Sequence, residues 1–243
     1  MAWSAEGGVL AGTTALVTGA SGGIGRAVAA RLRAAGAWVA MVARREGPLR
    51  AAAEAIGGHP IPADVTDAAA VHRLAEYLVE LLGGAGPGVV VNAAGSFHLA
   101  PVAETDPEIF DEQLAVNLRA PFLVMRAFLP RMLARGSGHI VTIGSVAGRR
   151  AFPHNGAYAA SKFGVRGLHA VLDVELRGTG VRATLIEPAA TATPLWDRID
   201  PSRHPGVPAR ESMLSPEAVA DAVLYAVTQP PEVDVRRVLL ERA

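Results

Sequence analysis

The sequence predicts an α/β fold in which a parallel sheet is covered by helices on both faces. Short apolar runs alternate along the chain with longer segments rich in Ala, Leu and Arg. The short runs hold few polar residues, which is typical of strands that are buried on both faces. A glycine-rich turn joins the first run to the first helical segment. Together these observations favour a doubly wound sheet of about seven strands.

The first half of the chain is expected to supply four strands and the helices between them. The run "TALVTG" at 13–18 leads into a helical segment with Gly36 as its C-cap, because glycine readily adopts the backbone conformation found at helix ends. The other strands of this half are predicted at 37–43, 59–64 and 88–95, with helices near 46–56 and 67–82.

The second half continues the alternation but contains one irregular stretch. The predicted elements are a long helical region at 107–134, a strand at 138–145, a helix at 156–177, a strand at 181–188, a helix at 216–228 and a strand at 235–241. The stretch 191–212 shows little periodicity and contains Pro194, Pro201, Pro205 and Pro208. A loop of that length in a compact domain is usually functional or mobile. We therefore expect one domain over residues 1–243, with a substrate lid at 191–212.

Composition argues against several classes of function. Of the 243 residues 50% are hydrophobic, and the 23 basic and 23 acidic residues cancel. No basic stripe indicates nucleic-acid binding, and the absence of cysteine excludes disulfides and thiolate metal sites. The seven histidines show no ligand spacing, so no metal is expected. The N-terminal segment does not look like a secretory signal, and no apolar run reaches the roughly 18 residues of a membrane span, so we expect a cytoplasmic protein.

A glycine motif follows the first predicted strand. In "VTGASGGIGRAVA", Gly19, Gly23 and Gly25 permit a tight turn, a close backbone approach and close packing of the helix on the strand. The start of the next helix then presents unpaired N–H groups and a positive dipole to an anion such as a pyrophosphate. Glycines also serve ordinary turns, but the place after the first strand of an α/β chain favours dinucleotide binding.

Tyr158 and Lys162 stand four places apart in "HNGAYAASKFG" at 154–164. On a helix these positions lie on one face, so that a phenol and an ammonium group share a small volume. The same spacing also arises by chance on solvated helix faces. The pair indicates a catalytic site only if other residues converge on it.

The order of the motifs resembles that of the short-chain dehydrogenase/reductase superfamily in its compact form. The glycines follow the pattern T-G-x-x-x-G-x-G, and "NAAG" at 92–95 ends the fourth strand. Asn117 lies in the long helical region, Ser145 ends the fifth strand, and Tyr158-x-x-x-Lys162 follows. The resemblance runs from about Thr13 to the last strand, which makes it highly specific. It implies a Rossmann-type fold.

The resemblance also implies a catalytic tetrad of Asn117, Ser145, Tyr158 and Lys162. Tyr158 would exchange a proton with the substrate oxygen while hydride passes to or from the nicotinamide, and Ser145 would orient that oxygen. Lys162 would hold the nicotinamide ribose and, together with oxidised nicotinamide, lower the pKa of the phenol from about 10. Asn117 would support a water that relays protons between Lys162 and solvent.

The cofactor implied by the sequence is NADP. Ala43 stands where NAD-preferring relatives carry an aspartate that binds the ribose hydroxyls, and Arg44 follows it with Arg45 beside it. Guanidinium groups suit phosphate oxygens, although arginines are also common in solvated turns. By resemblance, Asp64 and Val65 contact the adenine. The other implied cofactor contacts are Gly19, Ser21, Gly23, Ile24, Gly25, Asn92, Ala93, Gly95, Tyr158, Lys162, Pro188 and Thr193.

Two departures from the family pattern stand out. Ala189 occupies the place of a glycine after the sixth strand, which is costly only if the backbone there needs a positive φ. The segment "GAGPGVVV" lacks an aspartate that relatives often place ahead of the fourth strand, a difference we interpret as structural.

The function expected is NADP(H)-dependent interconversion of a ketone or aldehyde and an alcohol. One alternative is a non-catalytic NADP-binding regulator on the same fold, although a regulator has no need of Tyr158. Another is a sugar-nucleotide epimerase or dehydratase, but too little chain follows Thr193 for the substrate domain that those relatives carry. Candidate pocket residues are apolar, and the chain lacks the Gly-rich C-terminal tail of 3-oxoacyl-carrier-protein reductases. These pocket candidates are Phe97, Phe152, Leu195 and Trp196.

The resemblance finally implies a homotetramer or homodimer. Compact relatives pair through the long helices, which are predicted here near 107–134 and 156–177.

Overall fold

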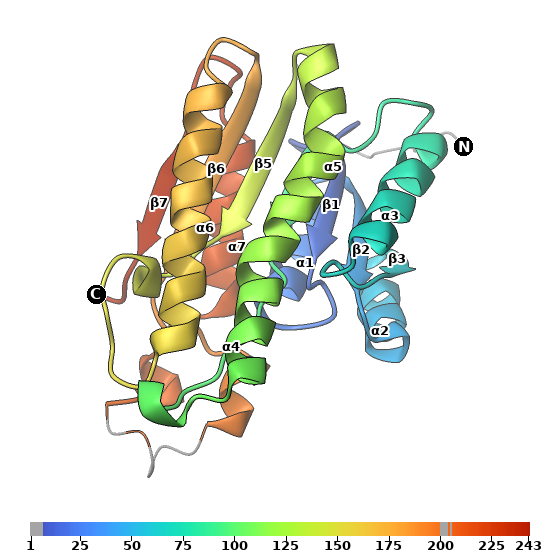
Figure 1. The fold of residues 1–243 in the computed structure, drawn as a ribbon. Helices are drawn as coiled ribbons and strands as arrows, with labels where there is room; N and C mark the ends of the chain where they lie inside the picture. Colours follow the sequence, from blue (N-terminus) through green and yellow to red (C-terminus); the bar gives the residue numbers. More distant parts are fainter. Residues whose placement is uncertain (1–6, 200–203, 205) are drawn as a thin grey trace.

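The structure, a computed structural model, describes residues 7–199, 204 and 206–243. Within these residues seven parallel strands form one sheet in the order β3-β2-β1-β4-β5-β6-β7 (Figure 1). The strand order reverses between β1 and β4, which is the arrangement of a doubly wound Rossmann-type sheet. The strands are β1 (Thr14–Thr18), β2 (Trp38–Ala43), β3 (His59–Pro62), β4 (Val89–Asn92), β5 (Gly138–Ile143), β6 (Val181–Pro188) and β7 (Arg237–Leu240).

Helices cover both faces of the sheet, as the sequence predicts. One face packs against α1 (Gly23–Ala34), α2 (Glu46–Ile56) and α7 (Pro216–Val227). The other packs against α3 (Ala68–Leu81), α5 (Ala120–Arg135) and α6 (Gly156–Glu175), with α4 (Pro107–Leu114) beside α6 (Figure 1). The predicted fold class is therefore confirmed.

Side chains from each central strand enter both apolar cores. In β1, Val17 belongs to the core under α1 and α7, whereas its neighbour Leu16 belongs to the core under α3 and α5. Successive residues of a strand point to opposite faces, so a strand covered on both sides must be apolar throughout. Each fully buried Val or Leu contributes roughly 1.5–3 kcal/mol, and these two cores hold the carboxyl ends of the strands in place.

The long helical region predicted at 107–134 is interrupted. Between α4 and α5 the residues Ala115–Arg119 form a π turn with Asn117 in its middle. Asn117 is 1% exposed. A π turn inserts one extra residue into the helix and is frequently found at functional sites. The sequence showed the helix but not this local widening.

Element boundaries otherwise lie within a few residues of the predicted ones. The first helix ends at Ala34 with Ala35 as its C-cap, one residue before the predicted cap Gly36, whose φ is 98°. Asp67 caps α3 by accepting hydrogen bonds from the N–H groups of Ala69 and Ala70. Ser145 follows β5 and begins a short 3₁₀ turn instead of ending the strand.

The irregular stretch 191–212 contains two short 3₁₀ turns, Pro194–Arg198 and Arg210–Ser212. A parallel bridge between Thr191 and Leu214 closes its base. Two of the four prolines expected to mark a lid, Pro201 and Pro205, lie outside the described residues.

The β3 edge of the sheet carries Pro60 and Pro62, which pair in register with Met41 and Ala43 of β2. The N–H of Ala63 donates to the carbonyl of Ala43. Side-to-side alternation along a strand then points the backbone nitrogens of the two prolines away from β2. The opposite edge is formed by β7.

Candidate active site

The turn after β1 packs too closely to hold side chains at two of its glycines. A Cβ on Gly19, whose φ is 67°, would lie 2.7 Å from the carbonyl oxygen of Ala93 at the end of β4. A Cβ on Gly25 would lie 2.4 Å from the carbonyl oxygen of Gly19. The two glycines thus let α1 start directly against the carboxyl ends of β1 and β4, at the reversal of strand order where such folds bind ligands.

The start of α1 suits an anion. Its N-cap is Gly22, which provides no side-chain hydrogen bond, and the first turn holds no acidic residue. A Cβ on Gly22 would meet nothing within 4 Å, so the space in front of the helix is open. The N–H groups of the first turn therefore remain available, and the helix dipole favours negative charge there. This arrangement fits a pyrophosphate, and Ser21 lies in the same turn.

Thr193, which follows the carboxyl end of β6, lies against this turn. A Cβ on Gly23 would lie 3.3 Å from the Thr193 side chain, and Thr193 itself is buried. Ile24 turns the other way and packs partly against the core of α1 and β1. The predicted contacts Gly23 and Thr193 are therefore brought together, whereas the Ile24 side chain lies on the core side of the helix.

Arg44 and Asp64 mark the end of the site next to β2. Arg44 is exposed and makes no hydrogen bond or salt bridge within the described residues. Partial burial raises the pKa of the Asp64 carboxyl, but hydrogen bonds from Thr66 and the nearby Arg44 charge outweigh it and hold that pKa below its usual range. Val65 is buried beside them. An exposed guanidinium at this corner fits a phosphate group on a ribose.

The end of β4 is fastened to the end of β1. The N–H groups of Ala93 and Ala94 donate to the Thr18 hydroxyl at 3.1 and 3.2 Å. Asn92 is 3% exposed, and in the described part of the chain neither atom of its amide group has a hydrogen-bond partner. An orphaned buried amide at the strand edge is costly, which is consistent with a polar ligand that completes its hydrogen bonds.

Asn117 connects the loop after β4 to α6. Its Oδ1 accepts a 2.9 Å hydrogen bond from the N–H of Ser96, and its Nδ2 donates to the Ser96 carbonyl at 2.9 Å. The same Nδ2 donates to the Ser161 hydroxyl at 3.1 Å, and that hydroxyl donates to the Tyr158 carbonyl. A Cβ on Gly95 would lie 3.4 Å from Asn117 Oδ1. The sequence interpretation missed Ser161, although its place within the Tyr158–Lys162 turn was a usable signal.

Tyr158 and Lys162 share one face of α6, as their spacing predicts. Lys162 Nζ lies 5.6 Å from the centre of the Tyr158 ring and donates to the Ile143 carbonyl at 2.9 Å. Ser145 Oγ accepts from the N–H of Ala147 and hydrogen-bonds the Tyr158 hydroxyl. The structure therefore brings Tyr158, Lys162, Ser145 and, through Ser161, Asn117 to one edge of the sheet.

Burial dominates the titration of this pair. It raises the pKa of Tyr158 to about 12, against an opposing contribution from Ser145, although part of the ring stays accessible. It also lowers the pKa of Lys162 to about 8. In the protein alone the pKa of the phenol is raised, because desolvation outweighs the opposing hydrogen bond from Ser145. The lowering expected from Lys162 together with oxidised nicotinamide stays a prediction.

Two of the four candidate pocket residues reach the site. The Phe97 ring packs edge-on against Tyr158, with ring centres 4.8 Å apart, and Trp196 lies 4.8 Å from Phe97. Phe152 is exposed and lies under the Arg150 guanidinium instead. Leu195 is likewise exposed. Aromatic side chains thus flank the Tyr158 ring.

Ala189 is accommodated without strain at the end of β6. In the described residues His154 is the one non-glycine residue with positive φ, so Ala189 lies in a region that any residue adopts. Its N–H donates to the Leu240 carbonyl at 2.8 Å, beside Pro188, which pairs with Leu240. The alanine therefore replaces the family's glycine at little cost.

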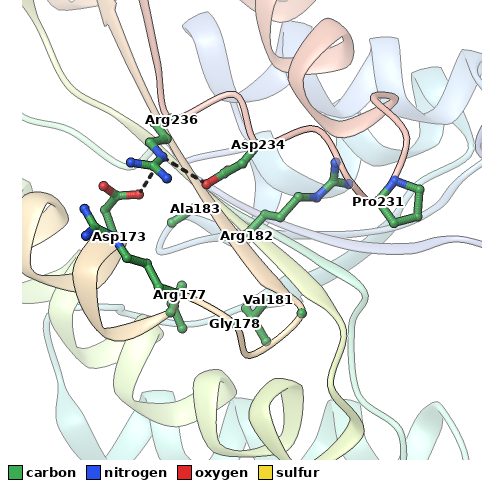
Figure 2. Close-up of a pocket in the computed structure, with 11 residues that line it drawn as sticks. Asp173, Arg177, Gly178, Val181, Arg182, Ala183, Pro231, Asp234 and Arg236 are labelled. Atoms are coloured by element: carbon green, nitrogen blue, oxygen red, sulfur yellow. Dashed lines mark hydrogen bonds and ion pairs between the residues drawn. The ribbon is translucent and has the colours of Figure 1, made fainter.

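A pocket of about 330 Å³ lies elsewhere, at the amino end of β6 (Figure 2). Arg236 spans it with ion pairs to Asp173 at 3.5 Å and Asp234 at 3.3 Å. None of the predicted site residues lines it. The part of the chain that the structure describes contains no group of three or more His, Cys, Asp or Glu side chains able to hold a metal ion. Nor does that part contain a helix long and apolar enough to cross a bilayer.

The sequence pattern of the family described as short chain dehydrogenase matches residues 13–204. The chain belongs to the short-chain dehydrogenase family. This family uses NAD or NADP to carry out oxidation and reduction, so the glycine turn and the free start of α1 in this short-chain dehydrogenase are accounted for by a dinucleotide.

Similar proteins cover nearly the whole of this short-chain dehydrogenase. A glycine betaine reductase of Emericella nidulans is 37% identical over 96% of the chain, which spans only 19% of that longer protein. An uncharacterized oxidoreductase of Staphylococcus epidermidis is 32% identical, with 93% of this chain and 95% of that protein covered. The crystal structure of a metagenomic short-chain oxidoreductase in complex with NADP is 34% identical, with a TM-score of 0.81 and coverage of 96% and 97%.

Proposed function

We propose that this short-chain dehydrogenase reduces an aldehyde or ketone to an alcohol with NADPH, and catalyses the reverse oxidation. The observation that carries the proposal is the meeting of Tyr158, Lys162 and Ser145 at the sheet edge onto which the start of α1 opens. A dinucleotide held at α1 would present its reactive ring at this edge. The same residues would have no evident use in a protein that only bound the dinucleotide.

In the proposed mechanism Ser145 and Tyr158 act on the substrate oxygen, and Lys162 acts on Tyr158. The Ser145 hydroxyl holds the carbonyl oxygen beside the Tyr158 hydroxyl, which donates its proton to that oxygen. The phenol is protonated at neutral pH, as a proton donor must be, but burial raises the pKa of Tyr158 to about 12, so the proposal requires that charge brought by the bound ligands lower this pKa. When bound, the reduced cofactor supplies the hydride.

After Tyr158 has donated its proton, we assign the reprotonation of its hydroxyl to Lys162 and the π turn. A pKa of about 8 lets Lys162 both hold and release a proton near neutral pH. The Asn117 side chain spends both donor hydrogens on Ser96 and Ser161, so a relaying water would bind the backbone of the π turn rather than the amide. This detail modifies the role that the resemblance gave to Asn117.

The preference for NADPH rests on the corner between β2 and β3. Arg44 offers an exposed guanidinium that makes no hydrogen bond or salt bridge in the described part of the chain, and Ala43 brings no carboxylate that would repel a 2′-phosphate. The NADP complex of the similar metagenomic enzyme agrees with this preference. Asp64 and Val65, next to Arg44, are proposed to contact the adenine.

The substrate is proposed to carry an apolar or cationic group next to its carbonyl. Phe97 and Trp196 offer ring surface beside Tyr158, and aromatic rings attract quaternary ammonium groups. One relative is named as a reductase of glycine betaine, which bears such a group. A trimethylammonium aldehyde is therefore a second candidate alongside apolar carbonyl compounds.

The test is NADPH oxidation, followed by absorbance, with a panel of aldehydes and ketones. The panel includes betaine aldehyde and its uncharged isostere 3,3-dimethylbutanal, which differ only in the charge of the head group. Turnover with any member supports the enzyme, and a higher kcat/KM for betaine aldehyde supports the cationic substrate. NADPH binding without turnover of any compound would instead favour the regulator.

The proposal includes an oligomer, a lid and one domain over residues 1–243. Apolar side chains on α5 and α6 are exposed, which suits pairing of two copies through these helices in a homodimer or homotetramer. They are Phe122, Leu133, Phe163, Val171 and Val174. The lid is the segment 191–212, because its Trp196 contacts Phe97. A cytoplasmic location is proposed because NADPH is generated inside cells.

A further inference from the structure

A carboxylate lies buried in the wall of the candidate site. Glu187, the residue before Pro188 in β6, is 1% exposed. Within the described residues neither of its oxygens has a hydrogen-bond partner. Isolated burial of an ionised carboxylate is strongly unfavourable, so surrounding charge has to stabilise it.

Three arginines supply that charge from three different segments. Arg237 Nε lies 3.6 Å from Glu187 Oε2, and Arg149 Nη1 lies 3.9 Å from the same oxygen. Arg166 Nε lies 3.8 Å from Oε1. The carboxylate is thus enclosed, whereas the arginine side chains remain partly exposed, at 34%, 40% and 49% for Arg149, Arg166 and Arg237.

Two of these segments, those of Arg149 and Arg166, also hold part of the candidate active site. Arg149 follows the 3₁₀ turn that Ser145 begins, and Arg166 lies one helical turn beyond Lys162, on the face of α6 that also bears Tyr158. On the strand side, a Cβ on Gly144 would lie 3.4 Å from Glu187 Cγ. One carboxylate therefore links the Ser145 segment, the Lys162 segment and the end of β6.

We propose that Glu187 is a positioning residue, which through Arg149, Arg166 and Arg237 fixes Ser145 and the Tyr158–Lys162 face of α6 relative to the end of β6. This proposal rests on the proposed function. Glu187 contributes through geometry and charge and does not touch the substrate. Buried ion clusters add little to stability compared with apolar packing, but they can specify a single arrangement of the elements that they join.

We expect the charge of the cluster to reach Tyr158, because Arg166 lies two helical turns beyond Tyr158 on the same face of α6. The charged groups around Glu187 are Arg149 from the turn after β5, Arg166 from α6 and Arg237 from β7. Near Tyr158 the titratable group is Lys162, whose Nζ lies 5.6 Å from the centre of the Tyr158 ring. Removing the Glu187 charge leaves three cations uncompensated, which favours the phenolate and lowers the pKa of Tyr158.

The test compares Glu187→Gln, which keeps the shape and removes the charge, with Glu187→Asp, which keeps the charge and shortens the side chain. A matched control is Glu241→Gln, because the Glu241 carboxylate pairs with Arg150 at the surface.

Glu187→Gln should lower kcat by up to about 100-fold through misplacement of reacting groups, with the NADPH Kd changed less than about threefold. In the pH profile of kcat/KM for Glu187→Gln, the fall in rate at alkaline pH should move to lower pH. Glu187→Asp should keep that fall in place, and Glu241→Gln should behave as wild type.

A second readout needs no turnover. Tyrosinate absorbance, taken as the difference from a Tyr158→Phe background, reports the ionisation of Tyr158 directly, and Glu187→Gln should shift it to lower pH. An unmoved Tyr158 titration, or a loss of kcat with an equal loss of NADPH affinity and of Tm, would overturn the positioning role. If wild type reduces no carbonyl compound while the titration still moves, the proposed function fails and the link between Glu187 and Tyr158 stands.

Discussion

At the scale of single residues, Tyr158 shows that a sequence motif predicts the position of a side chain but not its pKa. The spacing to Lys162 places the two groups on one face of α6, but it does not reveal which of two opposing effects controls the phenol. In the structure desolvation prevails, and the pKa of Tyr158 rises to about 12. The residue is therefore protonated at neutral pH, but with this pKa it is a weaker acid than free tyrosine, so its use as a proton donor depends on charge that the ligands bring to the site.

Replacing Tyr158 with Phe tests this role. The ring would still pack against Phe97, but no proton could be passed to the substrate oxygen, and positioned acid–base catalysis contributes about 10²–10⁴-fold. We expect kcat to fall by at least about 100-fold. NADPH affinity, measured by fluorescence, should stay within a few-fold. A mutant that retained more than a tenth of the wild-type rate would remove Tyr158 from the mechanism.

Arg44→Asp tests the preference for NADPH. The change removes a charge-assisted contact with the 2′-phosphate and adds repulsion, so kcat/KM for NADPH should fall at least ~10-fold. NADH lacks the phosphate, and the new carboxylate can accept hydrogen bonds from its ribose, so its use should hold or improve. Arg73→Asp on the exposed face of α3 is the control. Equal losses with both cofactors would show that Arg44 is a turn residue only.

Residues found by the motifs and residues found only by the fold differ in kind. Tyr158, Lys162, Ser145 and Asn117 could be named as candidates because their order along the chain is itself informative, and the structure brings them together. Glu187 could not, since its importance depends on three arginines that are far apart in the sequence and meet only when β6, β7 and α6 pack together.

At the scale of elements, the strands and helices followed from periodicity, whereas their irregularities did not. Apolar runs and glycines located every strand within a few residues. The π turn at Asn117 escaped prediction because its segment has the helical composition of its neighbours, and a one-residue insertion leaves little trace in the pattern.

The segment 191–212 should close over the substrate. Trp196 already lies on Phe97, and Arg210 pairs with Asp197 and donates to the Thr193 carbonyl, so the two 3₁₀ turns are linked to each other and to the cofactor side. We expect limited proteolysis to cut within 191–212 in the free protein. Cofactor plus substrate should suppress the cut. A cut that both ligands together leave unaffected would argue against a lid.

Two buried histidines under α6 make the packing of α6 on β5 and β6 sensitive to acid. The Thr184 hydroxyl donates its hydrogen to the Val235 carbonyl, so it accepts the 2.7 Å bond from His139 Nε2. Burial, with the charges of Arg182 and His169, lowers the pKa of His139 to about 3. Burial also lowers that of His169 to about 4, although Asp173 opposes this.

Both pKa values lie below the unfolded value near 6.5, so the unfolded chain binds more protons in acid. The contribution of the two neutral histidines to the free energy of unfolding is therefore fully present above pH 6.5, and it is lost as pH falls from there toward 3. Between pH 7 and 5 each histidine should remove about 2 kcal/mol of unfolding free energy. Urea denaturation of wild type and His139→Gln measures this, and the mutant should lose about half of the pH dependence. His72→Gln on the exposed side of α3 should change nothing, and identical pH dependence in all three proteins would refute the assignment.

At the scale of the whole molecule, exposed apolar side chains concentrate on α5 and α6. Phe122 and Phe163 are each 45% exposed, and Val171 is 56% exposed. Large apolar residues in that number on neighbouring helices are typical of a surface that another copy covers.

A charge placed in this surface should separate the copies. We expect wild type to sediment as a dimer or tetramer and Phe163→Glu to shift toward the monomer, because burying an unpaired carboxylate is unfavourable. Val9→Glu, at a residue that is 71% exposed and lies away from α5 and α6, is the control. A wild-type protein that stayed monomeric at all concentrations would contradict the proposed assembly.

The two prolines of β3 disfavour one way in which copies of the protein could associate, namely through hydrogen bonds between the edge strands of their sheets. A strand at the margin of a sheet normally offers its outward N–H groups to any passing chain, which is the first step toward fibres. Along β3 the outward nitrogens belong to Pro60 and Pro62, which have no hydrogen to give. A strand that approached this margin would therefore find no N–H donor at these two positions, which disfavours strand-to-strand association there.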